Sequence, residues 1–217
     1  MLFRSSPAPA GLGIGIQLRL WSQSNFGQNL VINPRGGPLY YWVADSNPNT
    51  FNRAQLLSST NTNTQNGTQW WLTDSSCPSV CNYVLVSDAS RFVIAMGVND
   101  YGSAVQDPLL IRWSDQESVT TWAPAVTNQA GSYRLSQGSQ IITATQTRQE
   151  ILVWTDAAIY SMQYLGPPYV WGFQIMGSNI SIMGPNVTAT ANNVTYWMGT
   201  DKFYMYTGRD RKSTRLN

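Results

Sequence analysis

One pattern of apolar and polar positions recurs four times along the chain. A short apolar strand runs into a polar turn and then into a strand rich in aromatic residues. The copies read LVINPRGGPLYYW from Leu30, FVIAMGVNDYGSAVQDPLLIRWSD from Phe92, ILVWTDAAIYSM from Ile151 and VTYWMGTDKFYMYTG from Val194. Their spacing is close to the roughly 40–50 residues of one propeller blade, with room for loop insertions. A chain of repeated hairpins is first of all a scaffold.

The remaining sequence between residues 21 and 208 also reads as short strands separated by Gly, Pro, Asn and Asp turns. This spacing is typical of a sandwich, a barrel or a propeller, and the recurring hairpin favours the propeller. We therefore predict one all-β domain over residues 21–208, built of β-propeller-like repeated antiparallel sheets. Because four units lie at the low end of the about four to eight blades that close a ring, we expect an incomplete propeller.

Two stretches depart from this strand pattern. Residues 1–20, with glycines between Leu and Ile, are expected to form an extended N-terminal arm. Residues 46–69, rich in Asn, Thr and Gln, predict a long exposed polar loop. Inside that loop Arg53–Leu57 is the one segment that we assign to a helix, of about one and a half turns.

The composition bears on the class of function. Charged residues make up 11% of the chain, and the formal net charge is +2. A charge this small does not indicate nucleic-acid binding by bulk electrostatics. The chain has no histidine, and its glutamates are Glu117 and Glu150. Because histidine is the commonest general base and metal ligand, we expect no enzymatic activity and no cofactor. No apolar run reaches the ~18 residues of a membrane span.

Cys77 and Cys81 lie in the segment CPSVC. Two cysteines without histidine partners cannot close a zinc site, so no metal is expected. A disulfide between them would close a small loop and stabilise little. We favour two thiols, and the redox compartment stays open.

Aromatic residues supply the first candidate surface. The chain has nine Trp and eleven Tyr, and most of the Trp are expected in the core. The adjacent pair Trp70 and Trp71 is the exception, because strand alternation turns one of the two rings outward. We expect any binding surface at this pair and at Tyr101 and Tyr169.

Basic residues supply the second candidate surface. Arg91, Arg112, Arg134 and Arg148 recur through the middle of the chain. They are candidates for lining a DNA channel, where neutralising phosphates would carry no sequence preference. Ordinary arginines on strand faces are the alternative, and we favour it.

Two acidic pairs are candidate sites. Asp115 and Glu117 would share one face of an extended segment. A glycosidase needs two carboxylates across the scissile bond, usually from separate elements, so a solvated turn is the better interpretation. Asp156 and Asp201 occupy matching places in WTDAAIY and MGTDKFY. One interpretation is a ligand or calcium position that is repeated by symmetry. The other is that both are turn residues, and we favour this second interpretation.

Beyond these local patterns, residues from about 82 to 208 resemble a specific family. The segments RFVIAMGVNDYGSAVQDPLLIRWSDQES, QAGSYRLSQGSQIITATQTRQEILVWTDAAIYSMQYLGPPYVWGFQ, NISIMGP and VTYWMGTDKFYMYTGR carry the resemblance. WSQSNFGQNLVINPRGGPLYYW, earlier in the chain, fits the same family. The family is that of tail structural proteins of short-tailed, podovirus-like bacteriophages, related to tail nozzle and packaged-DNA-stabilisation proteins.

The resemblance implies a β-propeller-containing virion protein, made in the bacterial cytoplasm and assembled into a homo-oligomeric ring around the DNA exit channel. Its expected partners are other tail proteins on the adaptor or portal side, the fibres, and the passing DNA. Its implied work is mechanical: it retains the genome and passes it on during ejection. No catalytic residue is carried over. The position in the tail, as nozzle, hub or plug, does not follow from the resemblance.

The family pattern continues past the region of Tyr206 to Arg209, whereas DRKSTRLN at the end of the chain shares neither its alternation nor its aromatics. We therefore expect residues 209–217 to lie outside the family pattern and Lys212–Asn217 to be translated adapter sequence of a metagenomic contig. A propeller broken off in this way has open strand edges, so we expect poor solubility or oligomerisation of this chain alone.

Two other classes stay open as alternatives. One is a carbohydrate-binding β-propeller, receptor-binding or lectin-like, that uses exposed Trp. The other is a secreted glycoside hydrolase.

Overall fold

The computed structural model describes residues 20–44, 54–57, 63–65, 68–71 and 76–208. Its strands form three four-stranded sheets, one three-stranded sheet and one two-stranded sheet. The first sheet contains β1 (Trp21–Phe26), β2 (Asn29–Pro34), β3 (Tyr40–Trp42) and β4 (Gln55–Leu56). The second contains β7 (Tyr83–Val86), β8 (Val93–Met96), β9 (Leu110–Trp113) and β10 (Gly131–Arg134). The third contains β11 (Ile141–Gln146), β12 (Ile151–Thr155), β13 (Ala158–Gly166) and β14 (Val170–Ser178).

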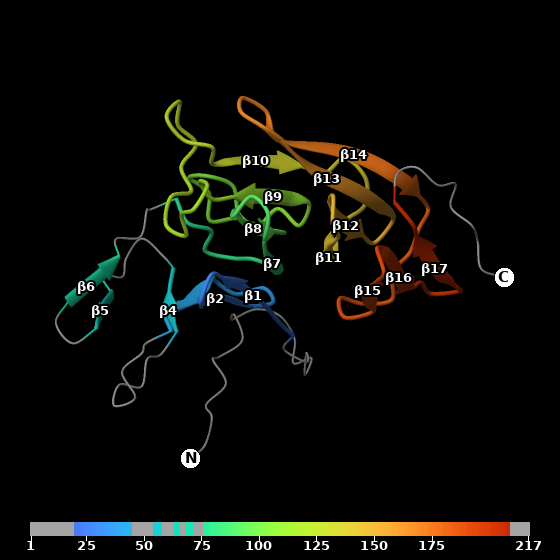
Figure 1. Cartoon of the computed structure of the whole chain (residues 1–217), viewed down its shortest axis with the longest axis horizontal. Helices are drawn as coiled ribbons and strands as arrows, with labels where there is room; N and C mark the ends of the chain where they lie inside the picture. Colours follow the sequence, from blue (N-terminus) through green and yellow to red (C-terminus); the bar gives the residue numbers. More distant parts are fainter. Residues whose placement is uncertain (1–19, 45–53, 58–62, 66–67, 72–75, 209–217) are drawn as a thin grey trace, which may run out of the picture.

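The three-stranded sheet contains β15 (Thr188–Ala191), β16 (Val194–Met198) and β17 (Phe203–Tyr206), and the two-stranded sheet contains β5 (Asn63–Gln65) and β6 (Thr68–Trp71). In each of the larger sheets the strands pair with their neighbours in sequence, and all of these pairs are antiparallel. Figure 1 shows these four sheets side by side along an arc, with β1, β7, β11 and β15 toward one open side. The fold is therefore a partial β-propeller, as predicted, and we name the four sheets blades 1 to 4.

The cores lie between successive blades. One cluster joins blades 1 and 2 through residues such as Val31 and Val93, and a second joins blades 2 and 3 through residues such as Ile94 and Val153. A third joins blades 3 and 4 around Trp154. Because neighbouring strand residues point to opposite faces, blades 2 and 3 are apolar on both faces. A strand buried on both faces reads as a continuous apolar run, as in VIAM of β8 and ILVWT of β12.

Polar side chains hold the innermost strands together. The hydroxyls of Ser22 and Ser24 on β1 accept hydrogen bonds from the backbone N–H groups of Val84 and Val86 on β7, both at 3.0 Å. These bonds satisfy donors at the edge of β7 that no strand pairs with. Hydroxyls also link the next two blades, since Thr145 on β11 lies 2.7 Å from Thr188 on β15. Short polar residues on the inner strands therefore replace a backbone ladder between blades.

The recurring sequence pattern corresponds to the second and third strands of each blade. The copies that begin at Leu30, Phe92, Ile151 and Val194 contain the hairpins β2–β3, β8–β9, β12–β13 and β16–β17. Successive connections of an antiparallel sheet alternate between the two ends of its strands. These four hairpin turns therefore lie at the same strand end in every blade, which we call the first end. The turns β1–β2, β7–β8, β11–β12, β13–β14 and β15–β16 lie at the second end.

Two predictions for the polar region are wrong. The segment expected to be helical contains β4, which pairs with Tyr40 and Tyr41 of β3, because the open edge of blade 1 offers more hydrogen bonds than an isolated helical turn. Part of the expected loop forms the hairpin β5–β6. The expected N-terminal arm, apart from Leu20, and residues 209–217 lie outside the described residues. Among the described residues, no helix has the length and apolarity needed to cross a membrane.

Candidate functional site

Arg112 is one of the four arginines that were candidates for lining a DNA channel. It lies on β9 with 2% of its surface exposed. Its guanidinium donates to the backbone carbonyls of Ser76 at 2.6 Å, Asn99 at 3.2 Å and Trp122 at 3.2 Å. The candidate role of Arg112 in lining a DNA channel is therefore wrong, because its side chain is buried. Its charge holds three loops at the ends of blade 2, because buried carbonyls need donors.

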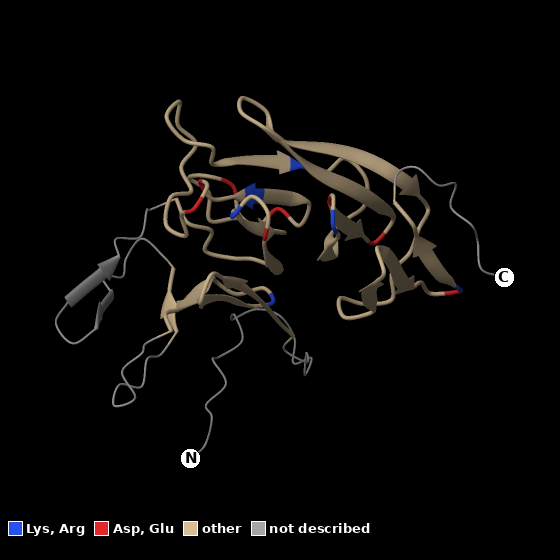
Figure 2. Ribbon diagram, viewed as in Figure 1, with Lys and Arg blue, Asp and Glu red and all other residues tan. Residues whose placement is uncertain are grey.

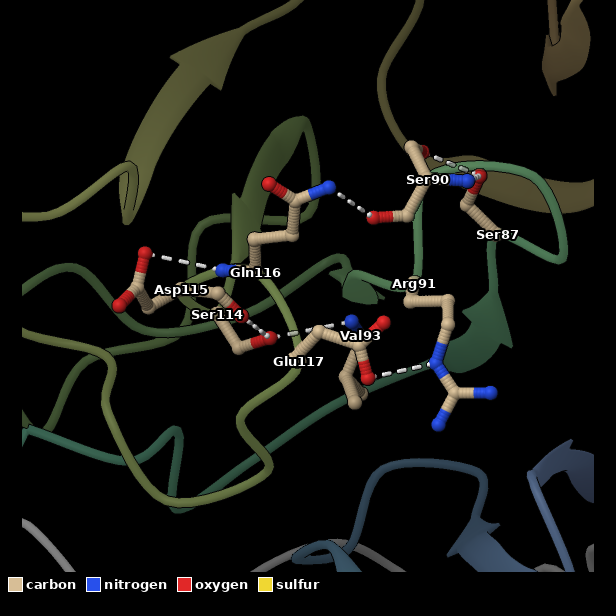
Figure 3. A network of polar contacts seen from close by, with 8 residues as sticks. All are labelled: Ser87, Ser90, Arg91, Val93, Ser114, Asp115, Gln116 and Glu117. Atoms are coloured by element: carbon tan, nitrogen blue, oxygen red, sulfur yellow. Dashed lines mark hydrogen bonds and ion pairs between the residues drawn. The ribbon is translucent and has the colours of Figure 1, made fainter.

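Arg91 lies at the second end, beside the acidic pair. Its Nε donates to the Glu117 carboxylate at 2.7 Å, and its guanidinium lies 5.0 Å from the centre of the Phe26 ring. Both Arg91 and Glu117 have positive φ, near 56° and 57°. Figure 3 shows the Glu117 carboxylate turned toward Arg91 and the Asp115 carboxylate turned away from both.

The Asp115 carboxylate bonds to backbone groups of the connection between β9 and β10. Its carboxylate accepts hydrogen bonds from the backbone N–H groups of Gln116 at 2.9 Å and Gln129 at 2.8 Å. Gln116 in turn donates to the Ser90 carbonyl at 3.1 Å (Figure 3). Asp115 and Glu117 are thus engaged in separate contacts and do not flank a common cleft. These contacts fit turn residues better than they fit the carboxylate pair of a glycosidase.

The other two arginines lie apart from each other. Arg134 is on β10, the outermost strand of blade 2, and pairs with Asp107 at 2.6 Å. Arg148 is exposed in the turn between β11 and β12, at the second end. Figure 2 shows Lys and Arg dispersed over the described ribbon among Asp and Glu. The structure therefore does not bring the four arginines together on one face. A channel-facing role remains a prediction for Arg91, Arg134 and Arg148.

The aromatic candidates are also separated. Tyr101 is 57% exposed in the β8–β9 connection, at the first end, and Tyr169 is 78% exposed in the β13–β14 turn, at the second end. The two tyrosines therefore cannot contact one small ligand together. Trp70 and Trp71 lie on β6, and their side chains are outside the described residues.

Asp156 and Asp201 do come together. They occupy the first-end turns of blades 3 and 4 and line one open cavity, with Asn179, Ser181 and Lys202. Asp156 accepts from the backbone N–H of Ser139 at 2.7 Å and from the Ser139 hydroxyl. Partial burial alone would raise the pKa of Asp156, but these bonds outweigh it and the pKa lies below the ordinary value. Asp201 pairs with Lys202 at 3.3 Å. The partner of Asp201 lies in its own turn, whereas Asp156 bonds Ser139 in the connection between β10 and β11.

Neither cysteine forms a metal site or a disulfide with the other. Both are buried thiols. Burial raises the pKa of the Cys81 thiol to about 12. In the part of the chain that the structure describes, no three His, Cys, Asp or Glu side chains gather as metal ligands would.

Arg35 is a residue whose role sequence reasoning missed. It lies in the β2–β3 turn and donates across to blade 3, to the carbonyls of Ile142 at 2.9 Å and Ile141 at 3.3 Å. Half-burial lowers the pKa of its guanidinium, against the opposing influence of Cys81. The signal in the sequence was a single cation in the turn PRGGP. Because its acceptors are about 107 residues away, that signal could not reveal the contact.

The terminal blades each have one face that no described blade covers. On blade 4 this face carries Tyr196, Met198, Phe203 and Met205, paired across β16 and β17. Tyr196 is 43% exposed and Phe203 is 64% exposed. On blade 1 the corresponding face carries Leu30, Ile32 and Tyr40, all half-buried, and Trp21, which is 57% exposed. Neither set contains a charged side chain.

The comparisons with known proteins concern the fold alone. No protein-family model and no curated protein matches the chain. Among solved structures, Hsv2 of Kluyvelomyces marxianus is similar with a TM-score of 0.41 and 9% sequence identity. The match covers 85% of this chain and 46% of Hsv2, so the chain spans less than half the length of that protein. The assignment of blades rests on the sheet topology described above.

Proposed function

We propose that the protein is a structural component of the tail of a short-tailed bacteriophage, one subunit of a homo-oligomeric ring around the DNA channel. It would retain the genome and pass it on during ejection, without catalysis. The proposal takes its class from the segments that resemble such tail proteins, which lie mostly in blades 2 to 4.

One structural observation supports an assembly role in particular. Among the described residues, the face of blade 4 turned away from blade 3 exposes Tyr196 and Phe203. Exposed apolar sheet faces of this kind mark contacts with other protein. A part of a larger particle has such contacts, whereas the candidate carboxylates Asp115 and Glu117 are engaged in local bonds.

Contact with DNA would be weak and independent of sequence under this proposal. Arg91 and Arg134 are paired with carboxylates, and the dispersed arrangement of basic residues offers no continuous track for a phosphate backbone. Smooth passage of DNA requires that it not be held tightly. We therefore expect retention of the genome to depend on ring geometry and neighbouring tail proteins such as the adaptor, portal or fibres.

The gene neighbourhood on a longer contig gives the first test. Portal, terminase and capsid genes beside this one are expected, and a neighbourhood of carbohydrate-metabolism genes would contradict the proposal. The second test places the protein in particles. Antibodies against the exposed β13–β14 turn around Tyr169 should label the tails of purified virions in electron micrographs, and capsid-only or absent labelling would refute a tail position.

A glycan array separates the carbohydrate-binding alternative. We expect no specific signal from the wild-type chain. Specific binding that is lost in Trp70→Ala or Trp71→Ala, but kept in Tyr101→Ala, would favour a lectin-like protein over a tail ring.

A further inference from the structure

A small cavity lies between blades 2 and 3 at the second end. Its volume is about 100 Å³, which is comparable with one branched aliphatic side chain. One wall is the β7–β8 turn, with Ser87, Ala89 and Ser90. The opposite wall is the β11–β12 turn, from Gln146 to Glu150. We call this space the blade 2–3 cavity.

The floor of the cavity is apolar and is built by the long hairpin of blade 3. The strand β12 pairs with β13 only as far as Met162, so Tyr164 of β13 and its direct partner Trp171 of β14 lie beyond β12. The two rings lie 5.5 Å apart, and their centres are 5.6 and 5.7 Å from the ring of Phe92 in blade 2. Trp171 is 7% exposed and Tyr164 is 40% exposed. These ring contacts hold an aromatic surface in place at the bottom of the cavity.

The polar groups of the β11–β12 wall are only partly used. The Thr147 hydroxyl donates to the Glu150 carbonyl at 2.8 Å. The side-chain carbonyl of Gln146 accepts from the backbone N–H of Asp88 at 3.2 Å, which ties the two walls together. The side-chain N–H groups of Gln146 have no acceptor among the described residues. They are therefore available as donors at the rim.

Arg148 adds an unused positive charge to the same rim. None of the described residues accepts a hydrogen bond from its guanidinium. The acid next to it in the turn, Glu150, is engaged toward blade 4, where its carboxylate accepts from the Tyr206 hydroxyl at 2.5 Å and from the Ser161 hydroxyl. Every other Lys or Arg in the described part of the chain has an acceptor or a carboxylate partner, namely Arg35, Arg91, Arg112, Arg134 and Lys202.

An apolar floor with free donors at its rim selects a compact apolar group that carries a carboxylate. Guanidinium and amide N–H groups both donate to carboxylate oxygens. In an extended chain, neighbouring side chains point to opposite faces, so an acidic residue and an apolar residue beside it do not enter one small cavity together. The C-terminal residue of a chain carries a carboxylate and a side chain on the same Cα, and it meets both requirements.

We propose that the blade 2–3 cavity binds the C-terminal residue of a partner protein, and that this residue is aliphatic. Its side chain packs on Trp171, its carboxylate pairs with Arg148, and the residue before it lies on the exposed part of Tyr164. Capture of a terminal carboxylate is a recurring mode of peptide recognition. A DNA phosphate, in contrast, uses the charge of Arg148 but not the apolar floor. The inference rests on this cavity and does not depend on a phage origin.

Titration of the full chain with small carboxylates tests the two halves of the site. The probe is N-acetyl-leucine; N-acetylglycine lacks its side chain and N-acetyl-leucinamide lacks its charge. Binding is followed by NMR through the indole N–H signal of Trp171, which is assigned with Trp171→Phe. The dissociation constant of N-acetyl-leucine should be at least about tenfold below that of N-acetylglycine, because a buried isobutyl group stabilises the complex. It should be at least about threefold below that of N-acetyl-leucinamide, a smaller effect because Arg148 is exposed.

A matched pair of variants tests the arginine. Arg148→Gln keeps a polar side chain without the charge and should weaken N-acetyl-leucine at least about threefold. Arg134→Gln is the control, because Arg134 is an exposed arginine on β10 outside the cavity, and it should leave the affinity unchanged. The peptide acetyl-Gly-Ser-Gly-Leu with a free carboxylate should bind more tightly than N-acetyl-leucine. The same peptide with a C-terminal amide should bind at least about threefold more weakly than the free acid.

The inference is overturned if N-acetyl-leucine leaves the Trp171 signal unmoved, or if Arg148→Gln and Arg134→Gln have equal effects. Inorganic phosphate that binds as tightly as N-acetyl-leucine would indicate a general anion site, including one for DNA phosphate. Binding of N-acetyl-leucine without binding of the peptide would assign the cavity to a free small carboxylate and not to a partner protein. A tail position in virions can stand in all these cases, so the failure of one proposal is distinguishable from the failure of the other.

Discussion

Replacing Arg112 with Met tests whether this arginine acts within the fold. The substitution keeps a long unbranched side chain but removes donors to the carbonyls of Ser76, Asn99 and Trp122. Hydrogen bonds to a charged group are worth about 1.5–3 kcal/mol each. Removing the buried charge also removes its desolvation cost, which offsets part of the loss of the three hydrogen bonds. We therefore expect the free energy of unfolding to fall by about 3–5 kcal/mol.

Urea unfolding followed by tryptophan fluorescence measures this loss. With a slope of about 2–3 kcal/mol per molar urea, the midpoint should fall by at least about 1 M. Arg134→Met is the matched control, because Arg134 is 59% exposed and its ion pair with Asp107 contributes at most about 1 kcal/mol. If Arg112→Met unfolds within about 0.5 M of the wild type while Arg134→Met costs more, the assignment of Arg112 to the core is refuted.

Three further predictions follow from buried or bonded groups. The Cys81 thiol, with a pKa of about 12, should resist a thiol reagent at mildly alkaline pH in the native protein and react on unfolding; rapid native labelling would contradict its burial. Ser139→Ala should destabilise the fold at pH values above 3.8, the ordinary pKa of Asp156, because it removes a bond to the ionised carboxylate. The difference in stability between variant and wild type should vanish as the pH falls through the lower pKa of Asp156 in the folded state. Thermal midpoints measured against pH would show this. Tyr206→Phe removes a hydrogen bond of 2.5 Å to Glu150 and should cost about 1–3 kcal/mol in urea unfolding; an unchanged midpoint would show that the bond adds nothing.

The second and third strands of each blade could be predicted because both the strands and their turn are local. Apolar runs such as that of β12 and the turn at Asp156 lie within a few residues of one another. Two of the innermost strands carry a weaker apolar signal, since β1 reads WSQSNF and β15 reads TATA. Their hydroxyls are used to bond the next blade, as Ser22 does to Val84, and that need arises only in the assembled fold.

The candidate sites could not be predicted to the same degree, because each depends on contacts far along the chain. Arg112 lies in LLIRW, where nothing nearby distinguishes a buried cation from an exposed one. Its acceptors come from loops 10 to 36 residues away. The segment of β4 looked helical for the same reason, since its partners on β3 are outside any local window.

Alternation in the sequence predicts that a strand has an apolar face, but it does not predict whether another blade covers that face. Alternation in VTYWM predicts that both Tyr196 and Trp197 belong to apolar faces, just as ILVWT does for Leu152 and Val153. The periodicity is the same whether a neighbouring blade is present or not. Only the arrangement of blades reveals that Trp197 is covered and Tyr196 is not. Because the face already has the composition of an interior, assays of association are expected to reveal the function of this protein sooner than assays of turnover.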